Sequence, residues 1–211
     1  QLKILLISFL ATIVLGIFTI PILQRLKVGQ SEREDGPKSH LKKSGTPTMG
    51  GLIMAISIIG ASIVAFVHYI GKEPEVGRKL IPLIVATIGF GVIGFIDDYK
   101  KVVLRNTDGL KPSAKMFGLL IISIMYVIYI EKILNIGTDI IIPFFKTTIT
   151  LPALVYIPFT IFVMLATTNA INLTDGIDGL ATSVTLVIVT TITVIAIIFD
   201  VKEIIILGSI V

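Results

Sequence analysis

The sequence has no cysteine and few charges. Its 211 residues include two His and 15% charged residues, against 54% apolar residues and a mean hydropathy of +0.97. Without cysteine there is neither a disulfide framework nor a thiolate metal site. Soluble domains carry about 25% charged residues, and disordered chains combine low hydrophobicity with high charge. The composition therefore excludes a disordered chain and argues strongly against a water-soluble globular enzyme.

What the chain has instead is long apolar runs. A bilayer core about 30 Å thick needs roughly 20 apolar residues in a helix. We expect an all-α polytopic membrane protein, with one transmembrane domain over residues 1–211. A seventh run begins at Ile204 and is too short to span before Val211, so we expect a truncated seventh helix and a C-terminal part beyond it. The six complete runs are Leu2–Leu23, Met49–Ile70, Leu80–Ile96, Phe117–Ile130, Leu151–Ile171 and Leu180–Phe199.

The basic residues indicate an orientation. The loops at 24–48 and 97–116 lie on one side and carry eleven of the 18 Lys and Arg residues. By the positive-inside rule this side is cytoplasmic, together with a third loop at 172–179, and the N-terminus is outside. The first run is too long for a signal peptide and has no small-residue cleavage site after it, so we expect it to be retained. Basic loops between apolar runs favour a membrane surface or anionic substrates over nucleic acid.

The loop between the fourth and fifth spans lies on the opposite side. Two β-branched segments flank Pro143 within residues 136–150. This pattern predicts a small periplasmic β-hairpin.

The first polar cluster, Ser39–Gly51, leads directly into the second span. Thr46 or Thr48 is expected to cap that helix. Free backbone N–H groups beside Lys42 and Lys43 would then form an anion site. An equally good interpretation is a basic, well-capped loop that only fixes topology.

The second cluster places two adjacent carboxylates at the end of the third span. Asp97 and Asp98 repel each other and oppose the helix dipole, which favours cations at a C-terminus. We expect a divalent cation to compensate them, since Mg²⁺ prefers oxygen ligands. The alternative is that Lys100 and Lys101 neutralise the pair.

The third cluster follows the fifth span and repeats a polar residue every third position. Asn169, Asn172, Asp175 and Asp178 would lie on neighbouring faces of a helical path. The 172–179 loop contains no Lys or Arg, so its acids lack local salt-bridge partners. A merely solvated charge run is therefore a poor explanation.

The fourth piece precedes the fourth span and contains Lys111 and Lys115. Their ammonium groups would meet phosphates as point charges, although fixing topology is an equally good role. Carboxylates, Mg²⁺ and lysines together are the equipment of phosphoryl transfer. The site would suit a lipid phosphate in the inner leaflet and a soluble phosphorylated donor.

These four stretches closely resemble the bacterial phospho-N-acetylmuramoyl-pentapeptide transferase (MraY) family. The resemblance covers Ser39–Gly51, Gly94–Lys101, Gly109–Met116 and Asn169–Ala181, and the order of the spans between them. It implies a bacterial inner-membrane enzyme of peptidoglycan synthesis. Such an enzyme moves phospho-N-acetylmuramoyl-pentapeptide from UDP to undecaprenyl phosphate with Mg²⁺, giving lipid I and UMP. It also implies a ten-helix fold with a cytoplasmic active site, with a homodimer as a candidate assembly.

The resemblance also implies roles for individual residues. Asp97 and Asp98 match the acidic pair of the family, in which the first is proposed to deprotonate the lipid phosphate, and Asp175 matches an essential Asp. These three are the expected catalytic residues and candidate Mg²⁺ ligands, but the family's main metal ligand would lie beyond Val211. A chain of this length is therefore expected to be inactive alone. The expected substrate-binding residues are Lys43, Thr46, Thr48, Lys111, Lys115, Asn169, Asn172 and Asp178.

Three other functions stay open on the sequence. A sister transferase that moves N-acetylglucosamine-1-phosphate shares the paired Asp but differs in the first loop, around Gly45–Gly51. A membrane transporter would place ionisable residues near mid-membrane, whereas the acids here are at span ends. A non-enzymatic scaffold predicts that neutralising Asp97 or Asp175 changes nothing. For the transferase we expect direct attack by the lipid phosphate, with a phosphorylated Asp intermediate as the alternative.

Overall fold

The structure is a computed structural model that describes residues 2–25, 49–104, 109–142, 145, 147–175 and 179–211. Within this part of the chain six helices are long and apolar enough to cross a bilayer, as the sequence predicted. A short seventh helix follows them, and a π-helical turn at Tyr129–Ile133 extends the fourth. The helices are α1 (Leu2–Arg25), α2 (Gly51–Lys72), α3 (Pro74–Val102), α4 (Pro112–Ile128), α5 (Ala153–Thr174), α6 (Leu180–Ile198) and α7 (Lys202–Ile210).

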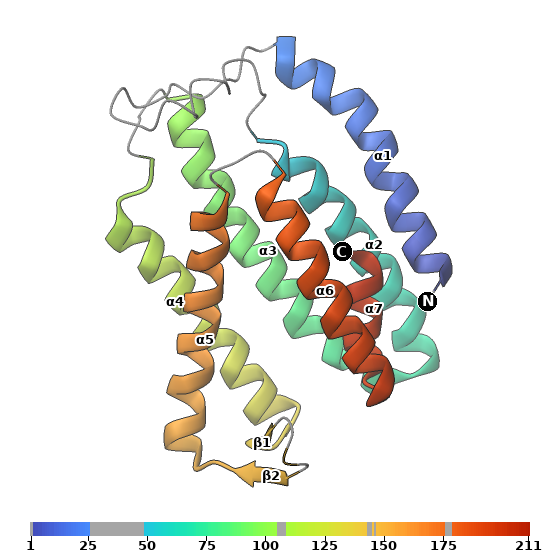
Figure 1. Ribbon diagram of the computed structural model, residues 1–211, viewed down its shortest axis with the longest axis vertical. Helices are drawn as coiled ribbons and strands as arrows, with labels where there is room; N and C mark the ends of the chain where they lie inside the picture. Colours follow the sequence, from blue (N-terminus) through green and yellow to red (C-terminus); the bar gives the residue numbers. More distant parts are fainter. Residues whose placement is uncertain (1, 26–48, 105–108, 143–144, 146, 176–178) are drawn as a thin grey trace.

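The helices pack largely in chain order. Each of α1 to α5 contacts the next, while α7 packs against α1, α2 and α3 (Figure 1). Helix α6 lies chiefly against α7 and touches α5 only slightly. The last described helix is therefore in the interior of the bundle, and the helix before it is outside.

The outer helices expose the apolar residues that a soluble protein would bury. No residue of α5 is buried, and only 6% of the most apolar window of α1 is buried. Soluble proteins rarely expose contiguous apolar surface on this scale. Such helices are stable in a lipid bilayer. Their apolar side chains face the hydrocarbon, and their backbone N–H and C=O groups are hydrogen-bonded within each helix.

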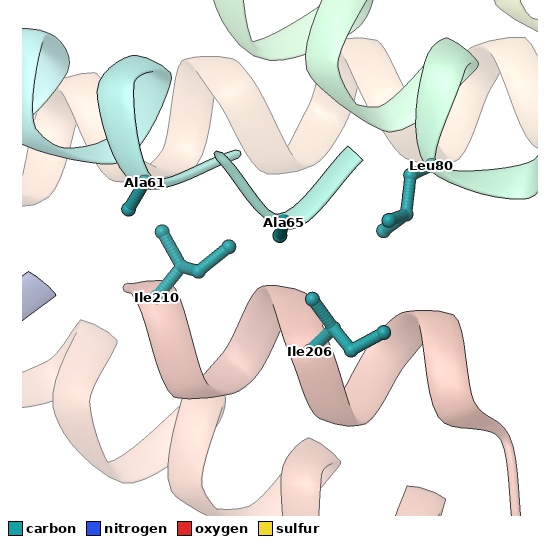
Figure 2. Close-up of a cluster of buried hydrophobic side chains, with 5 residues drawn as sticks. All are labelled: Ala61, Ala65, Leu80, Ile206 and Ile210. Atoms are coloured by element: carbon teal, nitrogen blue, oxygen red, sulfur yellow. The ribbon is translucent and has the colours of Figure 1, made fainter. Parts of the chain in front are cut away.

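The buried core lies where α7 meets α2 and the start of α3. Ile206 and Ile210 of α7 point toward Ala61 and Ala65 of α2, with Leu80 beside them (Figure 2). Ile206 is fully buried and Ala65 is 1% exposed. Small residues at such a contact allow two helix backbones to approach closely, which is how helices associate in lipid.

Helix α3 is longer than its apolar run. The sequence predicted a span over Leu80–Ile96, but the helix begins at Pro74 and ends at Val102. Proline is favourable in a first turn. Lys100 and Lys101 in the last turn complement the helix dipole, which lets the helix continue past the apolar segment. As a result, the beginning of the expected 97–116 loop is helical.

The predicted hairpin is confirmed. Strands β1 (Asp139–Ile142) and β2 (Thr147–Thr150) pair antiparallel, with Asp139 opposite Thr150. The hairpin connects α4 to α5 at the end of the bundle away from the C-terminal end of α3 (Figure 1). Its placement on the periplasmic side stays a prediction.

Candidate active site at the ends of α3, α4 and α5

Asp97 is a buried carboxylate near the C-terminal end of α3. The residue is 5% exposed. Its Oδ2 accepts a hydrogen bond from Lys101 Nζ at 2.7 Å, one helical turn further on. Its Oδ1 accepts one from the backbone N–H of Leu110 at 2.8 Å, and Lys115 Nζ lies 3.6 Å from Oδ2. Two lysines and a peptide N–H therefore compensate the charge of Asp97.

Lysine side chains thus supply part of the positive charge that was expected to compensate the acidic pair. Of the two lysines in the alternative for the acidic pair, Lys101 pairs with Asp97, and Lys115 adds a second cation from another helix. Hydrogen bonds to a charged group are roughly twice as strong as neutral ones. A buried carboxylate without them would be very costly.

Gly109 allows the chain to pass directly over Asp97. Its φ of +64° lies in the left-handed region, where residues with a side chain are strained. A Cβ at this position would lie 2.6 Å from Asp97 Oδ1 and 2.6 Å from Lys101 Cε. Only glycine fits here, and it brings the N–H of Leu110 within reach of the carboxylate.

Lys115 connects this carboxylate to the third polar cluster. Its Nζ donates a hydrogen bond to Asn172 Oδ1 at 3.0 Å. Lys115 lies in the first turn of α4 and Asn172 in the last turn of α5. The 172–179 segment has no Lys or Arg of its own, and here a lysine from α4 approaches its first residue.

Asp98 and Asp175 are the exposed carboxylates of the site. Asp98 follows Asp97 on α3, and Asp175 is the C-cap residue of α5.

Two further predicted residues lie nearby with other contacts. Asn169 is half-buried, and its Nδ2 donates to the Leu165 carbonyl at 2.8 Å within α5. Lys111 is the exposed N-cap residue of α4, and its carbonyl accepts from the Lys115 N–H at 3.0 Å. The helical path predicted for the third cluster holds for Asn169 and Asn172.

Some predicted positions lie outside the described residues, namely Lys43, Thr46, Thr48 and Asp178.

The prediction that a threonine caps the second span is wrong. Helix α2 begins at Gly51, and its N-cap residue is Gly50 with no side-chain capping hydrogen bond. Gly50 and Gly51 therefore begin this helix without a side-chain cap, and apolar residues follow them.

The Mg²⁺ site predicted at Asp97, Asp98 and Asp175 stays a prediction. Over the described residues, no three His, Asp or Glu side chains gather as a metal-binding group. Both oxygens of Asp97 are engaged by N–H donors. Mg²⁺, however, is usually held by one or two carboxylates together with substrate phosphates. Asp98 and Asp175 are exposed and fit that description, whereas Asp97 already accepts two hydrogen bonds, so its role as a ligand stays a prediction.

The sequence missed two parts of the site. The backbone N–H of Leu110 has no side-chain signal that could have revealed it. Gly109 is the first residue of the Gly109–Met116 stretch, but its role was not predicted, although a glycine there is a detectable sign of a close backbone approach. Lys101 was considered only as a neutralising residue.

Apolar helices of spanning length, with carboxylates, lysines and an amide gathered at one end, define a polytopic membrane protein with a polar site at the edge of the bilayer. Residues 80–211 match glycosyl transferase family 4, and residues 43–53 match the phospho-N-acetylmuramoyl-pentapeptide-transferase signature 1. The chain belongs to glycosyl transferase family 4.

Three similar proteins share one name. Phospho-N-acetylmuramoyl-pentapeptide-transferase of Acetivibrio thermocellus is 47% identical over 180 residues, which cover 84% of this chain and 51% of that protein. The protein of the same name from Clostridium botulinum strain Eklund 17B is 49% identical, over 85% of this chain and 52% of that protein. That of Caldanaerobacter subterraneus is 44% identical, over 85% and 53%. The chain spans about half the length of the curated relatives it matches.

Proposed function

We propose that the full-length protein transfers phospho-N-acetylmuramoyl-pentapeptide from UDP to undecaprenyl phosphate, forming lipid I and UMP. The relatives' name and the matched signature support this reaction. The structural observation that carries it is the cluster of Asp97, Lys115 and Asn172 at the end of apolar helices. A site at that depth is accessible to a lipid-borne phosphate and to a soluble donor alike.

In the proposed reaction a phosphate oxygen of the lipid attacks the β-phosphorus of the UDP-linked sugar. A new P–O bond forms, the bond from that phosphorus to the bridging oxygen breaks, and UMP leaves. Phosphoryl transfer depends mainly on positioning and on offsetting negative charge. Lys115 would hold a phosphate oxygen, and Asn172 would orient Lys115. Lys111 and Asn169 would line the same pocket.

The proposed cofactor is Mg²⁺, with Asp98 and Asp175 as the described residues that would hold it. When bound, the ion would neutralise charge on the pyrophosphate of the donor. Lys43, Thr46, Thr48 and Asp178 stay predicted substrate-binding residues, and a homodimer stays a predicted assembly.

We also propose that the site faces the cytoplasm and that the N-terminus is outside. The distribution of Lys and Arg supports this orientation. It would also give the site direct access to a water-soluble nucleotide donor made inside the cell.

The decisive test is UMP release by the full-length protein with polyprenyl phosphate and Mg²⁺. The donor would be UDP-N-acetylmuramoyl-pentapeptide in one arm and UDP-N-acetylglucosamine in the other. Release with the first donor alone is the expected result. Release with the second alone would replace the assignment by that of the sister transferase, and vesicle uptake of unchanged donor would indicate a transporter. As a control, Lys132→Ala changes a lysine whose side chain is 71% exposed near the hairpin, and it should leave the rate unchanged.

A variation of the same assay separates the two mechanisms. A burst of UMP in the absence of the lipid acceptor would require a covalent phospho-enzyme. We expect no burst, because direct attack releases UMP only when the acceptor is present.

A further inference from the structure

The β1–β2 hairpin has one apolar face and one largely polar face. Ile140 lies directly opposite Ile149 on the other strand, and side chains that face each other across two strands share a face of the sheet. Ile142 follows two residues after Ile140 on this face, with Thr147 opposite it. The other face carries Asp139, Ile141, Thr148 and Thr150.

The isoleucine face points toward the membrane side of the hairpin. Ile140 and Ile142 are half-buried, whereas all four residues of the other face are exposed. The hairpin lies at the end of the described bundle (Figure 1), so the atoms that cover these two isoleucines come from the bundle side. Ile149 points the same way but is 46% exposed. Its side chain therefore faces the bilayer beside the bundle.

The base of the hairpin is fixed to the start of α5. The Leu151 N–H donates to the Thr138 carbonyl at 3.1 Å, and the Thr138 hydroxyl donates to the Leu151 carbonyl at 2.5 Å. Helix α5 begins two residues later, and β2 runs across its direction (Figure 1). Transmembrane helices are tilted by only about 20° on average, so β2 lies close to the membrane plane.

The neighbouring helix ends place the hairpin at the bilayer interface. Tyr129 lies in the turn that extends α4, and Tyr156 lies in the first turn of α5. Tyrosine is enriched where the membrane meets water. Pro152, the N-cap residue of α5, is only about 6 Å further along the helix axis than Tyr156. Leu154 between them is 87% exposed, so the lipid-facing surface of α5 continues up to the hairpin.

The open edges of the hairpin limit how deep it can lie. The sheet has two strands within the described part of the chain, so each strand has one edge without a neighbouring strand. Unpaired backbone N–H and C=O groups do not face the hydrocarbon core. An exposed apolar face is in turn unfavourable in water, where a lone two-stranded hairpin is marginally stable. The interfacial layer meets both requirements, with water at the edges and acyl chains beneath the isoleucine face.

We propose that the β1–β2 hairpin is a lipid-binding surface that lies flat in the interfacial layer of the leaflet at its end of the bundle. The exposed part of the isoleucine face, with Ile149 at its centre, contacts the acyl chains, and the face with Thr148 is in water. Phe145, in the connecting turn and 75% exposed, contacts lipid at the same depth. In the proposed orientation this is the outer leaflet. The inference does not depend on the proposed transfer reaction.

The first experiment compares two adjacent residues that point to opposite faces. Ile149→Cys and Thr148→Cys variants of the full-length protein are labelled with a nitroxide in lipid nanodiscs. Collisions with oxygen, which partitions into lipid, are measured against collisions with a water-soluble nickel chelate. The ratio of oxygen to nickel collisions should be severalfold higher at Ile149 than at Thr148. Leu154→Cys is the lipid reference, and the protein without an introduced cysteine is the labelling control.

Two outcomes would overturn the proposal. A nitroxide at Ile149 as accessible to nickel as the one at Thr148 would place the apolar face in water. A nitroxide at Ile149 that collides with neither reagent would show that another part of the protein covers this face. If Ile149→Cys does not fold, Phe145→Cys decides in the same way, because an exposed turn side chain can be replaced without loss of core contacts.

The second experiment measures lipid contact and depth directly. The same cysteines carry a small fluorophore, and the nanodiscs contain lipids with bromine at a chosen position of the acyl chain. Bromine near the headgroup should quench the fluorophore at Ile149 severalfold more than bromine near the chain end, and it should quench Thr148 little. Stronger quenching of Ile149 by the deep bromine would contradict the interfacial position, and no quenching would exclude lipid contact. Neither experiment uses a substrate, so the result stands apart from that of the UMP assay.

Discussion

Lys115 Nζ donates a hydrogen bond of 3.0 Å to Asn172 Oδ1 and thereby joins the first turn of α4 to the last turn of α5. The two residues are 57 positions apart in the sequence. The same ammonium lies 3.6 Å from Asp97 Oδ2. One lysine thus connects residues from three helices at this end of the bundle.

This contact predicts an energetic coupling between Lys115 and Asn172. The free energy of unfolding would be measured for Lys115→Met, Asn172→Ala and the double variant. We expect a coupling energy of about 0.5–1.5 kcal/mol, as for a hydrogen bond with a charged partner that is partly screened by solvent. Lys111→Met paired with Asn172→Ala is the control, and that pair should be additive. Additivity for Lys115 and Asn172 would show that the contact contributes no stability.

The architecture could be predicted from the sequence because it depends on local patterns. The six spans follow from the lengths of apolar runs, and the hairpin follows from β-branched segments around a proline. The helix ends were less predictable. Polar residues such as Lys100 and Lys101 continue α3 because they complement its dipole, although they end its apolar run.

The site was predictable in its residues but not in its contacts. The sequence indicated Asp97, Lys115 and Asn172 separately, through spacing and charge. Nothing local indicates that the lysine lies between the other two, because this depends on how α3, α4 and α5 pack. The same holds for Leu110, which contributes a backbone group, and for the hydrogen bond of Lys101 to Asp97.

Residues 1–211 contain no cysteine, so a cysteine introduced among them can report the proposed orientation. Thr148 in the hairpin and Ser113 at the start of α4 are both exposed. Each would be replaced by cysteine in a separate variant, and the protein without either replacement is the labelling control. In intact cells a membrane-impermeant maleimide should label Thr148→Cys. It should label Ser113→Cys only after the membrane is opened. The reverse pattern would place the N-terminus and the candidate site on the opposite sides from those proposed.

The interior position of α7 predicts which apolar residues matter for stability. Ile206 is fully buried against α2, so Ile206→Ala would leave a cavity. We expect a loss of about 1–3 kcal/mol of unfolding free energy. This is less than the 2–5 kcal/mol of a soluble core, because helices in lipid associate through packing rather than through the hydrophobic effect.

The control for that substitution is of the same residue type. Ile17 on α1 is 64% exposed, and Ile17→Ala should change the unfolding free energy by much less. Unfolding in mixed micelles would be followed for both variants. Similar losses for the two would mean that α7 is not the packed element that Figure 2 shows.

An ion pair at the other end of the bundle predicts a pH dependence. Lys202 Nζ lies 2.6 Å from Glu73 Oε2 and so connects the start of α7 to the turn between α2 and α3. The hydrogen bond and charge of Glu73, with a smaller effect from Asp200, raise the pKa of Lys202 above its ordinary value. The pair therefore stabilises the fold in full below the ordinary lysine pKa of about 10.4, and this contribution is lost as the pH rises through the raised pKa.

Lys202→Met should consequently lower the unfolding temperature at pH 7, and more so at low salt, because the pair is exposed and screened by ions. The difference between the variant and the wild type should shrink once the pH exceeds the raised pKa of Lys202. Thermal unfolding at pH 7 and at pH values above 10.4 would measure it. Lys72→Met changes an exposed lysine at the end of α2, and its effect should vary less with pH. A difference for Lys202→Met that stays constant across this range would show that the ion pair does not stabilise the contact between α7 and the α2–α3 turn.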